Sequence, residues 1–494
     1  MAHITLSELV MPWVQTVTCE CVISGMSINS FTAKSGDVFI ANIGHKTDGR
    51  KYISIAIEKG VAAVIAEAKG QAKHGEIYEL KGIPIIYLDN LNQILSALAG
   101  RFYQQPSLSL RLIGVTGTNG KTTISHLLAN WVHLLGDISA VMGTIGNGLF
   151  NNIIYSTNTT SSAIDIQRLL KLFYEQGVNF TSIEVSSHGL VQYRVTDLYF
   201  AAAVFSNLSR DHLDYHLNMK SYEKAKWKLF SELKVCKRII NADDLVGYRW
   251  LRHLPQAIAV SARGSLPNNW QGDWLCADTV SYNDDSIDIL FNSCWGHGLL
   301  NSKLIGDFNV SNILLALATL LSLGYSLPAL LKTAGQLQSV CGRMEIFSAP
   351  NFPKVIVDYA HTPDGLKNVL VAAKRYCHGK LWCVFGCGGD RDKGKRPLMG
   401  AIAEKYADNI IITNDNPRLE LSKNIIESIQ SGLININCAK VISCRYKAIK
   451  IAIMQAKIKD LVLIIGKGHE NYQIIGNKHF YFSDRVTVSK ILGL

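Results

Sequence analysis

The sequence predicts an α/β protein in which helices cover mostly parallel sheets. Short apolar segments typical of buried strands alternate with longer segments whose apolar residues recur at helical spacing. Polar and charged residues cluster directly after several of the apolar segments. Because ligands of open parallel sheets bind at the carboxyl ends of strands, these clusters indicate where binding sites lie.

The length of 494 residues indicates several domains, since one domain accounts for about 150 residues. We expect a small N-terminal α/β domain at 1–92, a central domain at 93–338 with a phosphate-binding loop (P-loop) on a doubly wound, mostly parallel sheet, and a C-terminal Rossmann-like α/β domain at 339–494. The expected strands are 37–41, 62–66, 112–116, 181–185, 201–206, 355–357, 381–385, 410–413 and 461–465.

Composition excludes several classes of protein. The net charge of +11 is scattered, with no block of five or six basic residues, so we expect no nucleic-acid partner. The eleven cysteines show no zinc-binding spacing and are typical of reduced thiols. The longest apolar tract, 313–331, is interrupted by polar residues and Pro328, which favours a buried helix and turn over a membrane span. We expect a monomer in the cytoplasm, with no secretory signal at residues 1–10.

A glycine-rich turn, Gly117–Thr123, follows a predicted strand and opens an amphipathic helix. Such a turn directs backbone N–H groups and the positive end of the helix at phosphate oxygens. Lys121 would reach the outer phosphates, and the Thr122 hydroxyl would ligate Mg²⁺. The usual pattern has a glycine where this chain has Val115, one residue after Gly114. The turn predicts binding of ATP with Mg²⁺.

Two further residues stand out in the central region. Glu184 ends a predicted strand, where it would complete the oxygen ligands of Mg²⁺; a helix-capping or salt-bridged structural role is the alternative. Lys226 shares the apolar face of a predicted helix with Tyr222, Leu229 and Phe230. A buried ammonium needs a partner, so Lys226 either pairs with an acid, which the sequence favours, or is chemically altered.

Two polar segments follow predicted strands. Residues 209–216 hold two histidines and two aspartates, a spacing that identifies no particular metal. Residues 414–418 read Asn-Asp-Asn-Pro-Arg. Their carboxylate could hold an ammonium and their arginine could bind a carboxylate through two hydrogen bonds, as amino-acid recognition requires, although an Asn-Pro turn is the alternative.

Four motifs in order, Gly117–Thr123, Glu184–His188, Asp211–His212 and Asp358–Pro363, resemble the Mur ligase family, and the resemblance spans the whole chain. It implies a domain for a UDP moiety, a central ATPase domain and a domain for an incoming amino acid. It also implies a role in peptidoglycan synthesis. ATP would phosphorylate the γ-carboxylate of UDP-N-acetylmuramoyl-L-alanyl-D-glutamate, and an amine of meso-2,6-diaminopimelate would attack the acyl phosphate to form an amide.

The resemblance assigns site residues in five groups. The catalytic residues would be Lys121, Glu184, His212, Lys226 and His361. The nucleotide would be bound by Gly117, Thr118, Asn119, Gly120, Lys121, Thr122, Thr123, Asn309, Arg343 and Asp358. The UDP-linked dipeptide would be bound by Ile28, Ser30, His45, Lys46, Thr47, Asn158, Thr159, Thr160, Ser186, Gln192 and Arg194. Diaminopimelate would be bound by Arg391, Asp415, Asn416, Pro417, Arg418, Gly466 and Glu470. The metal ligands would be Thr122 and Glu184 for one Mg²⁺, and His212 and Lys226, as a carbamate, for a second.

The chain departs from the family pattern in two places. The family's Asp-Ser-Arg is Asn29-Ser30-Phe31 here, which bears on uridine binding, and its Asp-Pro after Glu420 is Leu421-Ser422. Arg418 favours diaminopimelate over L-lysine, because the two amino acids differ by one distal carboxylate. The alternatives are the same ligation with L-lysine, a ligase resembling folylpolyglutamate synthase, and a P-loop protein acting on nucleic acid.

Overall fold

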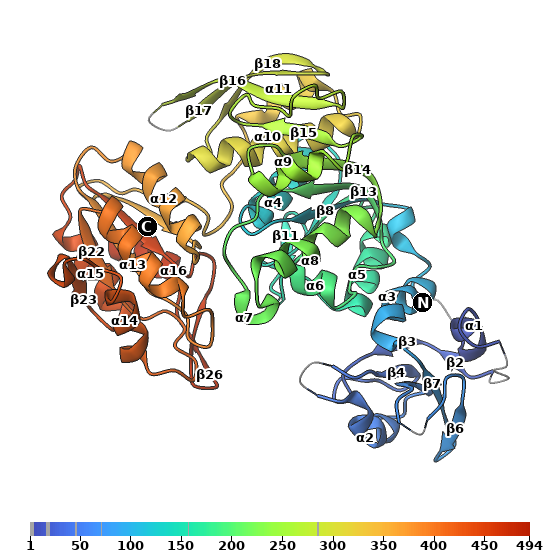
Figure 1. Cartoon of the computed structure of the whole chain (residues 1–494). Helices are drawn as coiled ribbons and strands as arrows, with labels where there is room; N and C mark the ends of the chain where they lie inside the picture. Colours follow the sequence, from blue (N-terminus) through green and yellow to red (C-terminus); the bar gives the residue numbers. More distant parts are fainter. Residues whose placement is uncertain (1–3, 16–19, 45–46, 71, 157, 284–285) are drawn as a thin grey trace. The chain divides into compact units, whose positions relative to one another are not determined.

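The computed structural model describes residues 4–15, 20–44, 47–70, 72–156, 158–283 and 286–494 (Figure 1). Its internal contacts divide the chain into two compact units. One holds residues 1–114, 137–203 and 225–236, and the other holds 115–136, 204–224 and 237–494. The boundary between the units passes through strands of the central sheet, so the predicted division at 92 and 338 remains a prediction.

The N-terminal sheet has five strands in the order β3-β4-β5-β7-β6. They are β3 (Gly25–Ser27), β4 (Asp37–Ala41), β5 (Ala63–Glu67), β6 (Ile77–Leu80) and β7 (Ile83–Leu88). All neighbours are parallel except β6 and β7. Alternate residues of the strands pack against helices α1 (Leu6–Val10) and α3 (Leu91–Phe102) on one face and α2 (Ile53–Glu58) on the other. A separate pair, β1 (Ile4–Thr5) and β2 (Val22–Ile23), is antiparallel.

The central sheet has eleven strands in the order β11-β10-β9-β12-β8-β13-β14-β15-β16-β17-β18. They are β8 (Arg111–Thr116), β9 (Ser139–Met142), β10 (Asn147–Leu149), β11 (Asn152–Ile154), β12 (Phe180–Glu184), β13 (Tyr199–Phe205), β14 (Lys234–Asn241), β15 (Ile258–Ser261), β16 (Trp274–Tyr282), β17 (Ile287–Ser293) and β18 (Gly296–Ser302). Parallel pairs such as β9/β12, β14/β15 and β15/β16 occupy the interior, whereas both edges are antiparallel. The mostly parallel interior was predicted, and the antiparallel edges were not.

The helices of this region follow the strands. They are α4 (Lys121–Leu134), α5 (Ala163–Glu175), α6 (Ser187–Val191), α7 (Leu213–His216), α8 (Met219–Ser231), α9 (Leu245–Leu251), α10 (Asp307–Ser322) and α11 (Leu327–Ala334). The apolar tract at 313–331 forms a buried helix and turn, as predicted, with Pro328 in the first turn of α11. Across the described parts of the chain, no helix has both the length and the apolar character needed to span a bilayer.

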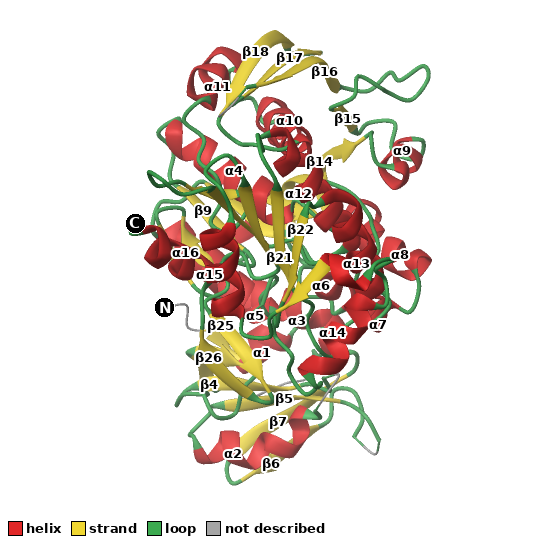
Figure 2. Cartoon of the chain, turned by 90° about the vertical axis from the view of Figure 1, so that its left-hand side faces the viewer, coloured by secondary structure: helices red, strands yellow, loops and turns green. Residues whose placement is uncertain are grey.

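The C-terminal sheet has the order β19-β20-β24-β21-β22-β23. Its strands are β19 (Glu345–Phe347), β20 (Lys354–Asp358), β21 (Leu381–Phe385), β22 (Asn409–Ile412), β23 (Ala439–Val441) and β24 (Leu461–Ile465). All neighbours are parallel except β19 and β20. Helices α12 (Pro363–Arg375), α13 (Lys395–Tyr406) and α14 (Ser422–Gln430) cover one face, and α15 (Arg445–Gln455) and α16 (Asp484–Leu492) cover the other (Figure 2). The hairpin of β25 (Tyr472–Ile475) and β26 (Lys478–Tyr481) follows β24.

The predicted strands agree with the observed ones to within two residues at each end. The alternation of core residues explains this agreement. In β24, for example, Leu463 and Ile465 pack against one helical layer while Val462 and Ile464 pack against the other. A strand covered by helices on both faces is continuously apolar, which makes it visible in the sequence.

Candidate active site

The glycine-rich turn has the backbone of an anion-binding loop. It connects β8 to α4, and Gly117 and Gly120 have positive φ angles of 151° and 88°. A Cβ atom added at Gly117 would lie 1.9 Å from Ser206 Oγ, and one at Gly120 would lie 2.6 Å from Asn312 Oδ1. Both positions therefore require glycine. Gly120 precedes α4 and provides no side-chain cap for the first amides of the helix.

Lys121 and Thr122 begin helix α4. The Lys121 ammonium donates hydrogen bonds to the carbonyl oxygens of Gly117 and Thr118, both at 2.9 Å. The Thr122 hydroxyl is nearly buried and accepts a hydrogen bond of 3.0 Å from the Arg343 guanidinium. Arg343 Nε is buried without a hydrogen-bond acceptor among the described residues. This orphaned donor beside the turn, together with uncapped helix amides, fits the oxygen atoms of a nucleotide phosphate.

Residues after β13 hold the turn in shape. Asn119 N donates to Asn207 Oδ1 at 2.9 Å, and Ser206 Oγ donates to Asn119 O at 2.6 Å. The hydroxyls of Thr118 and Tyr222 lie 3.2 Å apart. Burial raises the pKa of Tyr222, so its hydroxyl stays protonated. Ser206 and Asn207 lie just before the predicted polar segment at 209–216, and sequence spacing does not connect them to the turn.

Two other predicted nucleotide residues are fixed by their own surroundings. Asn309 is buried, donates to Ile305 O at 2.7 Å and accepts from Asn312 Nδ2 at 3.0 Å. Asn312, which is not among the predicted site residues, has its side chain next to Gly120. Asp358, at the end of β20, accepts hydrogen bonds from two backbone amides, and burial raises the pKa of its carboxyl.

Glu184 is fully buried at the end of β12 and belongs to the other compact unit. Its carboxylate accepts hydrogen bonds from the Thr144 backbone at 2.8 Å and the Thr144 hydroxyl at 3.0 Å. A Cβ atom at Gly143 would lie 2.2 Å from Glu184 Oε1, so the glycine makes room for the carboxylate. The turn at 143–144 was missed because its role depends on a strand that is distant in the sequence.

Several predicted residues for the UDP-linked dipeptide surround Glu184. The Thr160 hydroxyl donates to Glu184 O at 2.7 Å and accepts from Ser186 N at 2.9 Å. Arg194 donates to Thr160 O and to Gln192 Oε1. The hydroxyls of Thr144 and Thr159 lie 3.1 Å apart. The structure therefore brings Thr159, Thr160, Ser186, Gln192 and Arg194 together.

The other predicted dipeptide residues are less constrained. Asn158 and Thr47 are exposed, Ile28 is 41% exposed and Ser30 is buried. His45 and Lys46 lie outside the described residues. Their role in uridine binding remains a prediction.

The predicted metal ligands are divided between the compact units, with Glu184 and Lys226 in one and Thr122 and His212 in the other. Lys226 is 1% exposed, whereas Lys224 is exposed, which confirms the predicted buried face of α8. In the described part of the chain, no group of three or more His, Cys, Asp or Glu side chains could hold a metal ion by itself. The predicted set has only Glu184 and His212 of these types, and its other members, a hydroxyl and a modified lysine, would supply the hard oxygen atoms that Mg²⁺ prefers. The metal ligands remain a prediction.

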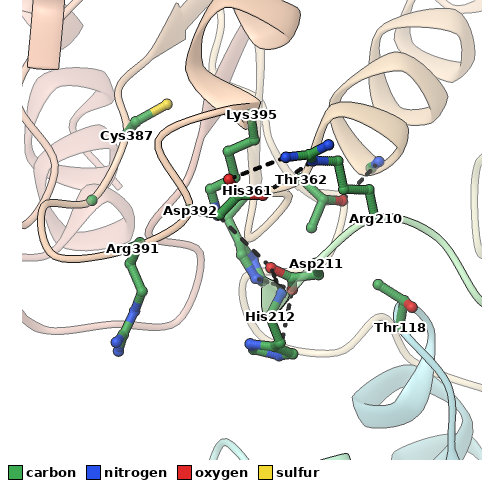
Figure 3. A network of polar contacts seen from close by, with 12 residues as sticks. Thr118, Arg210, Asp211, His212, His361, Thr362, Cys387, Arg391, Asp392 and Lys395 are labelled. Atoms are coloured by element: carbon green, nitrogen blue, oxygen red, sulfur yellow. Dashed lines mark hydrogen bonds and ion pairs between the residues drawn. The ribbon is translucent and has the colours of Figure 1, made fainter. Parts of the chain in front are cut away.

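Asp211 is the centre of a network of polar side chains (Figure 3). Its Oδ2 lies 3.4 Å from both His212 Nε2 and His361 Nε2, and Lys395 Nζ is 4.0 Å from Oδ1. Arg210 donates to Asp392 at 3.1 Å in the same network. Burial alone would raise the pKa of Asp211, but the hydrogen bond and charge of His361, with the charges of His212 and Lys395, hold it well below its usual value. The ionised carboxylate orients both imidazole rings.

The predicted amino-acid residues also converge. Asp415, after β22, lies against Gly466 after β24, because a Cβ atom at Gly466 would lie 2.6 Å from Asp415 Oδ2. Asn416 Nδ2 donates to Glu470 Oε2 at 3.0 Å. Arg418 has a left-handed backbone with φ of 52°, and its guanidinium donates to Gly389 O at 2.9 Å. Arg418 is half-buried.

Residues outside the predicted set hold this segment in place. Arg396, which is 2% exposed, pairs with Glu420 at 2.9 Å and donates to Gly388 O at 3.1 Å. Glu420 in turn accepts from Asp390 N, next to the exposed Arg391. The β25–β26 hairpin contributes Gln473, which donates to Asp415 O at 2.6 Å. Residues 415–418 are thus more than a local Asn-Pro turn.

Similarity to known proteins extends over the whole chain. Three family models match the chain: Mur ligase family, catalytic domain, at 22–103; Mur ligase middle domain at 115–320; and Mur ligase, glutamate ligase domain, at 342–468. A solved UDP-N-acetylmuramoyl-L-alanyl-D-glutamate–2,6-diaminopimelate ligase is 34% identical, with a TM-score of 0.69 over 100% of this chain and 99% of that chain.

Two more distant structures share the fold. The MurF ligase of Thermotoga maritima in complex with ADP is 18% identical, with a TM-score of 0.63 over 89% of this chain and 93% of that chain. The folylpolyglutamate synthase of Mycobacterium tuberculosis, complexed with ADP and AMPPCP, is 16% identical, with a TM-score of 0.61 over 76% and 92%. From the three matched domains and the full-length identity, this chain belongs to the Mur ligase family and is an ATP-dependent, amide-bond-forming ligase.

Proposed function

We propose that this ligase adds meso-2,6-diaminopimelate to UDP-N-acetylmuramoyl-L-alanyl-D-glutamate in peptidoglycan synthesis, through an acyl phosphate formed from ATP. The observation that carries the proposal is the convergence of Asp415, Arg418 and Glu470 at one edge of the C-terminal sheet. The similarity to a solved diaminopimelate ligase over the full chain supports the same assignment.

The charges of this site suit a diamino dicarboxylate. Carboxylates of Asp415 and Glu470 would hold ammonium groups, and the guanidinium groups of Arg418 and Arg391 would hold carboxylates. L-Lysine lacks the distal carboxylate and would leave an arginine without its anion. Such a loss costs about 2–5 kcal/mol, which is about 30- to 4,000-fold in selectivity.

The P-loop residues would bind the triphosphate, with Lys121 on the outer phosphates and Arg343 beside them. Thr122 and Glu184 would hold one Mg²⁺, and His212 with carbamylated Lys226 a second; bound Mg²⁺ neutralises charge on phosphoryl and acyl oxygen atoms. Asp211 would keep the imidazole rings of His212 and His361 in fixed orientations. Asp358 and Asn309 would complete the nucleotide site.

The UDP-linked dipeptide would be bound by the residues around Glu184 and by the N-terminal region. The hydrogen-bonded residues around Glu184 are Thr159, Thr160, Ser186, Gln192 and Arg194. Further contacts to the substrate would come from Asn158, Ile28, Ser30 and 45–47. We assign 1–92 to UDP binding, 93–338 to ATP and 339–494 to the amino acid. Because Thr160 bonds to the carbonyl of Glu184, the dipeptide and metal sites would share one strand end.

Phosphate release tests this proposal directly. The assay contains ATP, Mg²⁺ and UDP-N-acetylmuramoyl-L-alanyl-D-glutamate, with diaminopimelate or L-lysine in parallel, and the product is identified by mass spectrometry. We expect release that requires the UDP-linked dipeptide, and a kcat/KM at least about 30-fold higher for diaminopimelate than for lysine. Equal or better use of lysine would contradict the assigned amino acid. Activity with a folate and glutamate instead would contradict the whole proposal.

A further inference from the structure

We infer that Lys467 is a positioning residue of the amino-acid site, where it orients Asn416 and Glu470. The inference rests on the proposed function of residues 415–418 and 466–470 in binding the amino acid. Lys467 is fully buried directly after β24. Its ammonium donates to Asn416 Oδ1 at 3.1 Å and to Glu470 Oε2 at 2.9 Å.

The first consequence concerns the Asn416 amide. Its oxygen accepts from both Lys467 Nζ and the Ile474 backbone N–H, at 3.1 and 3.0 Å. Two donors on the oxygen fix which end of the amide is the NH₂ group. Asn416 Nδ2 is therefore directed at Glu470 Oε2, 3.0 Å away. Without the ammonium, one of the two contacts that set this orientation would be lost.

The second consequence concerns the Glu470 carboxylate. Oε2 accepts from Lys467 and Asn416, whereas Oε1 accepts no hydrogen bond from the described residues. The carboxylate is thus held at one oxygen and can offer the other to a substrate ammonium. A buried charge is tolerated only when it is paired and hydrogen-bonded, and the Lys467–Glu470 pair meets that condition for both members.

Lys467 also connects the site to the hairpin that follows it. Its ammonium lies 5.5 Å from the centroid of the Tyr472 ring, at the start of β25. That hairpin bonds to the predicted site through Ile474 O, which accepts from Arg418 N at 3.1 Å. The ammonium therefore contacts the two groups it orients and the strand that holds Arg418. None of these contacts involves the P-loop.

The test replaces the ammonium and keeps the length of the side chain. Lys467→Met, Lys467→Arg and the matched control Lys440→Met, an exposed lysine on β23 of the same sheet, are made in the full-length enzyme. Phosphate release is measured while ATP, the UDP-linked dipeptide and diaminopimelate are varied in turn. Melting temperatures establish that each variant is folded.

We expect Lys467→Met to raise the KM for diaminopimelate about 10- to 100-fold, because the substitution removes a hydrogen bond to a charged group. The kcat and the KM for ATP should stay close to those of the wild type. Lys467→Arg, which keeps the charge, should recover part of the loss, and Lys440→Met should match the wild type. If Lys467→Met does not fold, Lys467→Arg is decisive: a higher KM for diaminopimelate at unchanged kcat supports the inference.

Two results would overturn the inference. One is an unchanged KM for diaminopimelate in folded Lys467→Met, or in Lys467→Arg where Met does not fold. The other is an equal loss in kcat and in every KM, which indicates a general structural role. Failure of the proposed function is distinguishable, because the wild-type enzyme would then not use diaminopimelate at all.

Discussion

The phosphate-binding turn at 117–123 and the amino-acid segment at 415–418 both follow a parallel strand, yet they are built differently. Gly117 and Gly120 give the turn its conformation through their positive φ angles, and helix α4 begins directly after it. Arg418 has a positive φ without being glycine, and its backbone is held by Ile474 and Gly476 of the hairpin.

This difference shows which parts of the chain determine the specificity of each site. A phosphate is recognised by backbone amides and a helix end, which a short local sequence can supply. An amino acid with several charges needs side chains at fixed angles, and those are held by Arg396, Lys467 and Gln473 from elsewhere in the chain. A strained backbone such as that of Arg418 persists only where its surroundings over-determine it.

The largest effect on activity is expected at the phosphate-binding turn, which a short local sequence forms. Lys121→Ala should lower phosphate release about 1,000-fold or more, because the transferring phosphoryl group loses its fixed cation. The melting temperature should change little, since glycines set the conformation of the turn. Lys121→Arg, which keeps the charge, is the matched variant. Full activity in the alanine variant would remove the nucleotide assignment.

The second prediction tests the amino-acid segment at 415–418, which residues distant in the sequence hold in place. Arg418→Ala should raise the KM for diaminopimelate about 30- to 4,000-fold, through the loss of about 2–5 kcal/mol. The KM for ATP should change much less, because none of the contacts of Arg418 described above reaches the turn. Steady-state kinetics with each substrate varied will measure both constants. Equal effects on the two substrates would show that the sites are not separate in the way proposed.

A smaller effect, on stability, is expected at the Arg396–Glu420 ion pair, which supports the amino-acid segment. Hydrogen bonds from Arg396 lower the pKa of Glu420 from 4.5 to about 2. Since the folded pKa lies below the unfolded value, the stabilisation is complete above pH 4.5 and is lost as the pH falls toward 2. Glu420→Gln should therefore cost about 2–3 kcal/mol at neutral pH.

Calorimetric unfolding of the wild type and Glu420→Gln from pH 7 to pH 3 checks that pH dependence. The difference in melting temperature should be constant near neutral pH and should shrink below pH 4.5. A difference that grows with acidity would contradict the assigned role of the pair.

The smallest effect is expected at an exposed ion pair of the same region. Lys423 and Glu427 lie 3.8 Å apart on α14, with side chains that are 84% and 57% exposed. Lys423→Gln should cost less than about 0.5 kcal/mol, seen as a barely changed melting temperature. A cost equal to that of Glu420→Gln would show that burial is not what distinguishes the two pairs.

Much of the fold was predictable because strands buried on both faces are continuously apolar, as β21 and β24 show. The antiparallel edge strands β10, β11, β17 and β18 were missed because their half-exposed residues lack that signal. The short buried strands β9 and β15 were also missed. For the site, Gly117–Thr123 was recognisable from one local segment. Asn312 and Gly143 were not, because their roles depend on Gly120 and Glu184, which are distant in the sequence.

The sequence by itself determined the α/β class, the phosphate-binding turn and the buried position of Lys226, because local periodicity and glycine placement specify them. Only the tertiary structure decided that Asp211 lies between two histidines, that Glu184 rests on the 143–144 turn, and that Lys467 pairs with Glu470 and Asn416. The physical reason is that a buried charge must be paired, and its partners are side chains on neighbouring strand ends of the folded sheet. These partners are distant in the sequence, so spacing along the chain does not predict them.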